Sequence, residues 1–349
     1  MLTKSRSTQV VFRDVFYITV ISLILVGIGL PFLIDEYVRH NWTPSSFSPG
    51  YQLVFKKIVF SIPIAAIVLC KLIFDKKSIS TQTWIINCLV CGAIIFFLFI
   101  LKNPLVEKRN ALGPVYLLLI FLFYPKLVNS NLKTCLLLFV AMIIVFPLTQ
   151  ALTHLQYGIT ELIENPSLLS AVIDRGDLSK GFMSLNYDAF VNIGIAIEAT
   201  ELNGFSYGFQ LLSAFLFFVP RSIWAAKPDA SGLVLGNHVI EEYGFNFANL
   251  SNPLVSEGYM NFGIPGVAIM AFALALTCLF FLTWLNSNDY LKKATAFYFA
   301  IHLLFLLRGD FTNGYSYFVG VFIGIYVIPK LIIKMTGTIL DKKVWVNTN

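Results

Sequence analysis

Four short motifs in this chain hold charged side chains beside glycines or prolines, and the first is the segment Pro220–Pro228. Its sequence, P-R-S-I-W-A-A-K-P, holds Arg221 and Lys227 between two prolines, with Trp224 suited to a membrane interface. A guanidinium binds phosphate oxygens through two parallel hydrogen bonds. The segment is therefore a candidate clamp for a phosphate at the bilayer surface, and simple anchoring at that surface is the alternative.

The second motif is the segment Asn252–Gly266, N-P-L-V-S-E-G-Y-M-N-F-G-I-P-G, which places Glu257 at the start of a long apolar run. A carboxylate near a helix N-terminus often only complements the helix dipole. The same position suits a general base that faces a cavity and accepts a hydroxyl proton. Both interpretations stay open. The glycines of this motif favour close approach of the backbone to a ligand or to a neighbouring helix.

The third and fourth motifs are two similar turns, R-G-D-F-T-N-G at Arg308–Gly314 and R-G-D-L-S-K-G at Arg175–Gly181. An arginine and an aspartate at the end of an apolar run are costly without partners. Arg308 and Asp310 therefore pair with each other or with water, or they serve a ligand. We hypothesise that Arg175 and Arg308 converge on one phosphate-bearing ligand; a coincidental match of seven residues is the alternative.

The sequence lacks the motifs by which proteins commonly hold nucleotides or metals. It contains no Walker loop, GxGxxG, HExxH, zinc-ligand spacing or Asp-x-Asp, so we expect neither a nucleotide nor a metal cofactor. Among the four histidines, His238 is a candidate for contact with a substrate. The net charge of +6 does not predict a nucleic-acid partner, because the lysines and arginines gather at the ends of apolar runs, where they set membrane topology.

The elements that must position these residues are membrane helices. Hydrophobic residues make up 57% of the chain, charged residues only 13%, and the mean hydropathy is +0.76, which leaves too little polar surface for a soluble protein of 349 residues. The apolar runs are continuous rather than alternating, and helices satisfy the backbone within hydrocarbon. We predict an all-α polytopic membrane protein with about eight transmembrane helices. They are expected at Val15–Ile34, Ile58–Phe74, Trp84–Leu101, Leu112–Val128, Thr134–Leu152, Met260–Leu285, Ala294–Leu307 and Tyr315–Ile333.

The distribution of charge predicts how these helices are oriented. With both termini in the cytoplasm, fourteen of the 25 lysines and arginines fall in short cytoplasmic segments. Lys56, Lys57 and the stretch Lys102–Arg109 run against this trend. Residues 153–257 then form the main periplasmic loop, which holds eleven acidic and four basic residues.

One part of this loop, Ser206–Val219, is apolar but only fourteen residues long, which is short for a membrane span. We expect it to belong to a re-entrant or interfacial helical pair with residues 188–200; a pair of true spans is the alternative. The chain shows no internal repeat and no flexible linker. Residues 1–349 are therefore expected to form a single integral membrane domain.

The order of these motifs resembles bacterial O-antigen polymerases of the Wzy type. The resemblance is carried by the segments Pro220–Pro228 and Asn252–Gly266 and by the late R-G-D turn before the final span. It implies a glycosyltransferase that polymerises undecaprenyl-pyrophosphate-linked oligosaccharide repeat units into O-antigen or capsular polysaccharide. The reaction would take place at the periplasmic face of the bacterial inner membrane, with the growing glycan as donor and a single repeat as acceptor.

The resemblance also implies roles for the candidate residues. Glu257 first, and Asp310 second, would accept the proton of the acceptor hydroxyl. Charge on the departing pyrophosphate would be stabilised by four cations, Arg221, Arg308, Arg175 and Lys227. Sugar rings would stack on three aromatic side chains, Tyr259, Tyr315 and Trp224. The implied partners are undecaprenyl-pyrophosphate-linked glycans, membrane lipid and a chain-length regulator protein.

Three other functions stay open. An O-antigen ligase would share the outer loop and the arginines, but it would transfer finished chains to a lipid A core. A lipid-linked oligosaccharide flippase would hold cations in the middle of its spans, whereas the bases of this chain avoid span centres. A membrane scaffold without enzymatic activity is the third alternative.

Overall fold

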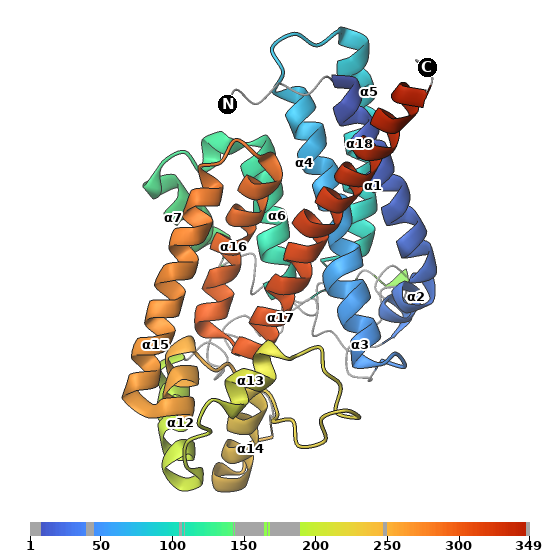
Figure 1. The fold of residues 1–349 in the computed structure, drawn as a ribbon. Helices are drawn as coiled ribbons and strands as arrows, with labels where there is room; N and C mark the ends of the chain where they lie inside the picture. The colour runs from blue at the N-terminus through green and yellow to red at the C-terminus, as the bar shows by residue number, and fades with distance from the viewer. Residues whose placement is uncertain are drawn as a thin grey trace.

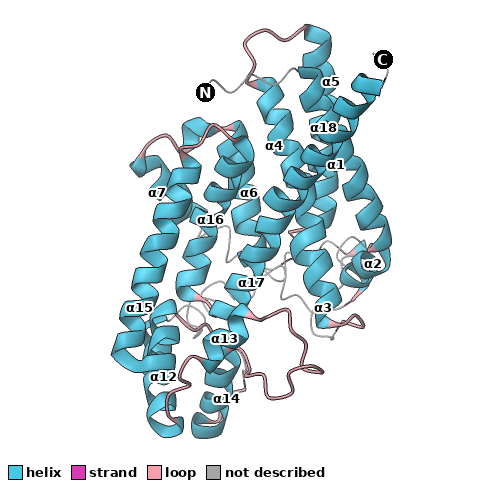
Figure 2. Ribbon diagram, viewed as in Figure 1, coloured by secondary structure: helices cyan, strands magenta, loops and turns pink. Residues whose placement is uncertain are grey.

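The protein is described as a computed structural model over residues 8–39, 45–104, 107, 109–141, 143, 164–165, 167, 189–246 and 250–346. Within these residues every regular element is a helix, and no strand occurs (Figure 2). The expected all-α fold class is therefore confirmed for the described part of the chain.

Six helices in the described residues are long and apolar enough to cross a membrane, and each has at least 19 residues. A helix of that length extends about 28 Å, close to the thickness of a bilayer's hydrocarbon core. The six helices indicate a multi-pass membrane protein. They run over Thr8–Ile28, Pro49–Phe74, Thr81–Leu101, Leu254–Leu285, Tyr290–Arg308 and Phe311–Gly337.

Two of the eight expected spans correspond to shorter helices. The run expected at Leu112–Val128 forms α6, Arg109–Phe123, and its helix stops just before Pro125, which opens a short 3-10 turn. The run expected at Thr134–Leu152 begins within α7, Asn131–Val140, and residues 144–152 lie outside the described residues. The expected first span is also divided, because α1, Thr8–Ile28, ends before Gly29 and α2, Leu30–Val38, follows.

The helices run up and down between two ends of one bundle (Figure 1). We call the end at which α1 begins and α18, Ile328–Val346, finishes the terminal end, and the opposite one the distal end. Three connections lie at the terminal end: residues 75–80, 124–130 and 286–289. The helices α12, α13 and α14 lie at the distal end together with α2 and α3, Pro49–Gln52.

The helix α4, Ile62–Phe74, forms the centre of the bundle. Ten of its thirteen residues are buried, which is typical of a helix that is apolar on all sides and surrounded by others. It packs on α1, on α5, Thr81–Leu101, and on α16, Tyr290–Arg308. Asn87 of α5 donates its side-chain amide to the carbonyl oxygen of Cys70 at 3.0 Å, so one buried polar group in this contact is satisfied.

Three short helices cover the distal end: α12, Ala189–Asn203, α13, Phe209–Phe215, and α14, Ser231–Tyr243. The apolar segment Ser206–Val219 thus contains a helix of only seven residues. At 1.5 Å per residue it extends about 10 Å, too little to cross a membrane. The helix α13 packs on α17, Phe311–Phe322, while α12 packs on α14 and on α15, Leu254–Leu285.

The helix α15 is broken near its start. Phe262 and Gly263 have non-helical backbone angles, and Gly263 has φ +66° with ψ −148°, a conformation essentially restricted to glycine. The segment Leu254–Leu285 is therefore two helices, and the long one, which begins after Gly263, covers most of the run expected at Met260–Leu285. The break lets the backbone fold back, so that Gly258 lies directly against Gly266.

We predict that Gly258→Ala destabilises the protein, because a Cβ atom there would lie 2.6 Å from the Gly266 carbonyl oxygen. Overpacking of this kind costs about 1–3 kcal/mol. Gly92→Ala in α5 is the matched control, since a Cβ at Gly92 meets nothing within 4 Å. Thermal unfolding of both variants in detergent tests the prediction, and equal melting temperatures for the two would contradict it.

Candidate functional site

The N-termini of three helices meet at the distal end of the bundle. Ser231 begins α14, Glu257 lies in the first turn of α15, and Asp310 is the N-cap residue of α17. All three side chains are buried; Glu257 is 2% exposed and Asp310 is 7% exposed. The two carboxylates that the sequence singled out as candidate catalytic groups therefore lie in one buried cluster, with Ser231 between them.

Hydrogen bonds join the three residues directly. The Ser231 hydroxyl contacts Glu257 Oε1 and lies 3.1 Å from Asp310 Oδ2. Backbone N–H groups complete the cluster: Phe311 donates to Glu257 Oε1 at 2.9 Å, and Gly232 donates to Asp310 Oδ2 at 2.9 Å. Residues 231, 257 and 310 are far apart in the sequence, so this contact holds three helices together.

The helix termini explain why carboxylates can be buried here. The first N–H groups of a helix have no partner within it, and the helix dipole favours negative charge at that end. Asp310 accepts the Asn313 N–H at 2.8 Å, which is an ordinary N-cap bond of α17. The geometry is therefore consistent with the helix-dipole interpretation of Glu257, and the partners of Asp310 are Ser231 and two backbone N–H groups. A catalytic role is compatible with it, because both carboxylates lie within reach of one exchangeable hydroxyl proton.

The segment Pro220–Pro228 folds into consecutive turns and leads through Asp229 to the start of α14. Arg221 donates to the Lys227 carbonyl oxygen at 2.5 Å and forms an ion pair with Asp229 at 2.5 Å. The Arg221 and Asp229 side chains are about half exposed, at 54% and 47%. Asp229 stands two residues before Ser231 in the chain. The candidate phosphate clamp and the buried carboxylates are therefore joined by a single short connection.

Lys227 serves the fold of this segment. Its ammonium group donates to the carbonyl oxygens of Leu216, Phe217 and Val219 at 2.9–3.0 Å. These carbonyls follow the end of α13, where a cation complements the helix dipole. Burial, together with the nearby charge of Arg221, lowers the pKa of Lys227. Of the two cations in the motif, Arg221 is thus the more accessible to an added anion.

The turn between α12 and α13 is fastened to the break in α15 through Asn261. The Asn261 amide donates to the Glu257 carbonyl oxygen at 2.8 Å, and its own oxygen accepts the Ser206 hydroxyl at 2.7 Å and the Leu211 N–H at 3.4 Å. The Ser206 N–H also donates to the Met260 carbonyl oxygen at 3.0 Å. The second motif of the sequence therefore positions α13 as well as Glu257.

The aromatic candidates surround this connection and are partly exposed. Tyr259 packs edge-on against Phe205 with ring centroids 6.0 Å apart, and Trp224 packs edge-on against Phe209 at 5.4 Å. Tyr315 packs against Phe215 at 5.2 Å. Each ring keeps part of its surface open, as a sugar-stacking residue requires.

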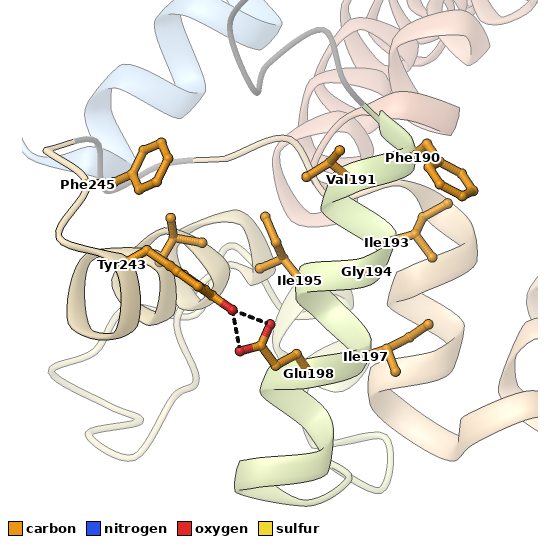
Figure 3. Close-up of a pocket in the computed structure, with 10 residues that line it drawn as sticks. Phe190, Val191, Ile193, Gly194, Ile195, Ile197, Glu198, Tyr243 and Phe245 are labelled. Atoms are coloured by element: carbon orange, nitrogen blue, oxygen red, sulfur yellow. Dashed lines mark hydrogen bonds between the residues drawn. The ribbon is translucent and has the colours of Figure 1, made fainter.

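His238 lies apart from the carboxylate cluster, at the contact of α14 with α12. It is 7% exposed and its Nε2 lies 3.6 Å from Glu198 Oε1. The Tyr243 hydroxyl donates to the same carboxylate at 2.8 Å, and this bond raises the pKa of Tyr243 (Figure 3). Glu198 and Tyr243 close one side of an apolar cavity of about 510 Å³ between the two helices.

Of the two arginines in the R-G-D turns, the structure describes Arg308 but not Arg175. Arg308 is the last residue of α16, half-buried, and two residues before Asp310. A cation there complements the C-terminal end of the α16 dipole. Arg175 lies outside the described residues, so its expected convergence with Arg308 stays a prediction.

A second charged cluster was not assigned a role from the sequence. This cluster joins one side chain of α2 to three others: Glu36 with Lys56, Lys102 and Glu107. Lys102 is only 1% exposed. Lys102 Nζ donates to the Lys56 carbonyl oxygen at 2.6 Å and lies 3.6 Å from Glu107. Burial lowers the pKa of Lys102, and the Glu107 charge opposes that shift. The signal in the sequence was that these lysines ran against the charge trend.

Lys57 connects this second cluster to the carboxylates. Its ammonium group donates to the Ser316 hydroxyl of α17 at 2.5 Å and lies 4.3 Å above the ring of Tyr317. Its electrostatic interactions are strongest with Glu107, Lys102 and Lys56 and weaker with Asp310. The distal end therefore places one cation, Lys57, against α17, whose N-terminus binds the two carboxylates.

Within the residues that the structure describes, no three His, Cys, Asp or Glu side chains gather where they could hold a metal ion. Comparison of the chain with protein-family models, with curated proteins and with solved structures gave no match. The class that fold and composition define is a multi-pass helical membrane protein with a buried carboxylate pair at one end.

We predict that Lys227→Met loosens the segment after α13, because three carbonyl oxygens lose a charged donor. Bonds to charged groups contribute about 1.5–3 kcal/mol, so amide exchange in residues 219–227 should accelerate about tenfold or more. Hydrogen exchange followed by mass spectrometry measures this. Lys293→Met at the terminal end is the control, and equal protection in both variants would refute the role of Lys227.

Proposed function

We propose that this protein is a membrane glycosyltransferase that polymerises polyprenyl-diphosphate-linked oligosaccharide repeat units. The observation that carries the proposal is the short connection from Arg221, through Asp229, to Ser231 and the buried pair Glu257 and Asp310. It brings a cation suited to phosphate beside groups suited to a hydroxyl proton. The sequence resemblance to O-antigen polymerases of the Wzy type supports the same activity.

In the proposed reaction the acceptor hydroxyl oxygen attacks the anomeric carbon of the donor glycan. The bond from that carbon to the diphosphate oxygen breaks, and the polyprenyl diphosphate leaves with both electrons. The hydroxyl proton passes to the pair Glu257 and Asp310. Because the departing group is already activated, the chemistry requires neither a nucleotide nor a metal.

Arg221 is suited to receive the diphosphate because its present partner is easily exchanged. The ion pair with Asp229 is about half exposed, and exposed pairs contribute only about 0–1 kcal/mol. A diphosphate carries more negative charge than one carboxylate and can bind the guanidinium through two oxygens. Lys227 adds positive charge near Arg221, and in the proposal Arg308 contributes further charge from the end of α16. The partly exposed rings of Tyr259, Tyr315 and Trp224 offer stacking surfaces for sugars.

The distribution of lysines supports a periplasmic location for the distal end. The connections at the terminal end carry Lys76, Lys77 and Lys126, and Lys292 stands in the first turn of α16 at the same end, as expected for the cytoplasmic side. Both termini would then be cytoplasmic, and the site would face the side on which no nucleotide sugars occur. Lipid-linked glycans, surrounding lipid and a chain-length regulator protein are the partners in this proposal.

A flippase for the same lipid-linked oligosaccharide is the second candidate, and one observation favours it. Lys57 lies inside the continuous helix Pro49–Phe74, where a cation is expensive without function. Deletion of the gene separates the candidates. Loss of a polymerase leaves single repeats attached to the core, whereas loss of a flippase or of a ligase leaves none.

We predict that Arg221→Ala abolishes long-chain glycan in cells that lack the native gene, while single repeats remain. Removal of one donor that stabilises developing charge costs about 100-fold or more in rate. Electrophoresis of the lipopolysaccharide displays the chain-length ladder. Lys293→Ala, which removes one charge at the opposite end, should retain a normal ladder.

The Arg221 experiment has an internal check on folding. Asp229→Ala removes the same ion pair but leaves the guanidinium free, so it should retain long chains. Normal ladders from Arg221→Ala would refute the clamp. Loss of chains from Asp229→Ala as well would mean that the ion pair serves folding rather than substrate binding.

A further inference from the structure

The Ser231 hydroxyl stands between two carboxylates but has only one proton to donate. It contacts Glu257 Oε1 on one side and lies 3.1 Å from Asp310 Oδ2 on the other. If both carboxyl groups were ionised, one of these contacts would set two unprotonated oxygens against each other in a buried site. Such a contact is repulsive, and burial leaves no water to relieve it.

One additional proton turns both contacts into hydrogen bonds. A protonated carboxyl group donates to the Ser231 oxygen, and the Ser231 hydroxyl donates to the other carboxylate. The cluster then holds a single negative charge. Two carboxyl groups that share a site commonly hold one proton between them for the same electrostatic reason.

The surroundings of the two carboxyl groups differ, and they favour charge on Asp310. Asp310 accepts backbone N–H groups from Gly232 and Asn313 and is the N-cap of α17. Glu257 accepts one backbone N–H, from Phe311.

The cations near the pair favour the same assignment. Lys57, from the helix packed against α17, donates to the Ser316 hydroxyl of α17 at 2.5 Å and interacts electrostatically with Asp310, less strongly than with Glu107. Arg308, at the end of α16, stands two residues from Asp310 in the chain.

We propose that Glu257 and Asp310 share one proton in the resting protein, held on Glu257, and that Ser231 is the positioning residue through which it passes. The proposal deepens the proposed function and rests on it only for its catalytic consequence. In that reaction the ionised Asp310 is the member that can take a proton from the acceptor side. Both carboxyl groups are then protonated, and one proton leaves to solvent to restore the resting state, in which Ser231 again joins Glu257 to the ionised Asp310.

Infrared spectroscopy of the purified protein tests the shared proton without any glycan. A protonated carboxyl group has a C=O stretching band that an ionised carboxylate lacks. We expect such a band at neutral pH in the parent protein and in Glu242→Gln, where an exposed glutamate is replaced. It should disappear in Glu257→Gln. An unchanged band in Glu257→Gln, or its loss only in Asp310→Asn, would overturn the assignment.

The role of Ser231 is tested by glycan lengthening as a function of pH. Ser231→Ala should lower the rate about tenfold or more and shift the pH profile, because the connection between the carboxyl groups is lost. Ser231→Thr retains the hydroxyl and should restore both. An unchanged rate and profile in Ser231→Ala would contradict the role. If the parent protein lengthens no glycan but shows the Glu257-dependent band, the proposed function fails while the shared proton stands.

Discussion

The distal end of this protein depends on the burial of two carboxylates where three helices begin. A buried carboxylate without partners is so costly that it forces either protonation or hydrogen bonding. Glu257 and Asp310 obtain their partners from the first N–H groups of α14 and α17, which themselves lack partners within their helices. The carboxylates therefore gain donors, and the N–H groups at the helix starts gain acceptors. The relative positions of α14, α15 and α17 follow from this mutual requirement.

The same constraint explains why α15 is interrupted close to Glu257. The short first helix of α15 brings Glu257 to the cluster, and the turn at Gly263 starts the long helix in a new direction. Asn261 binds both the Glu257 backbone and the beginning of α13, so the segment that leads to Arg221 is held by the same turn. The segment that leads to Arg221 is thus held through Asn261 and the Glu257 backbone. The side chains of Glu257, Asp310 and Ser231 do not themselves hydrogen-bond to Arg221.

Much of the fold could be predicted from the sequence, because apolar runs and their charged ends report directly on membrane helices. Residue types also marked Arg221, Glu257 and Asp310 as candidate functional residues. Their meeting through Ser231 was not, since that contact joins residues 79 positions apart and Ser231 stands in no motif. The break at Gly263 was hidden inside an apolar run, although the sequence G-I-P-G carried the signal. Hydropathy alone could not reveal that Lys57 lies within a continuous helix, because a cation inside a span is costly without a partner. That partner, Ser316, comes from the other end of the chain.

The most direct test of the account is lengthening of lipid-linked repeat units by the purified protein in liposomes. We expect the protein alone, without nucleotide sugar or ATP, to join repeats and to release one polyprenyl diphosphate for each new glycosidic bond. Mass spectrometry of the glycan and quantification of the released lipid measure both quantities. Intact repeats after prolonged incubation with folded protein, and no released diphosphate, would contradict the account.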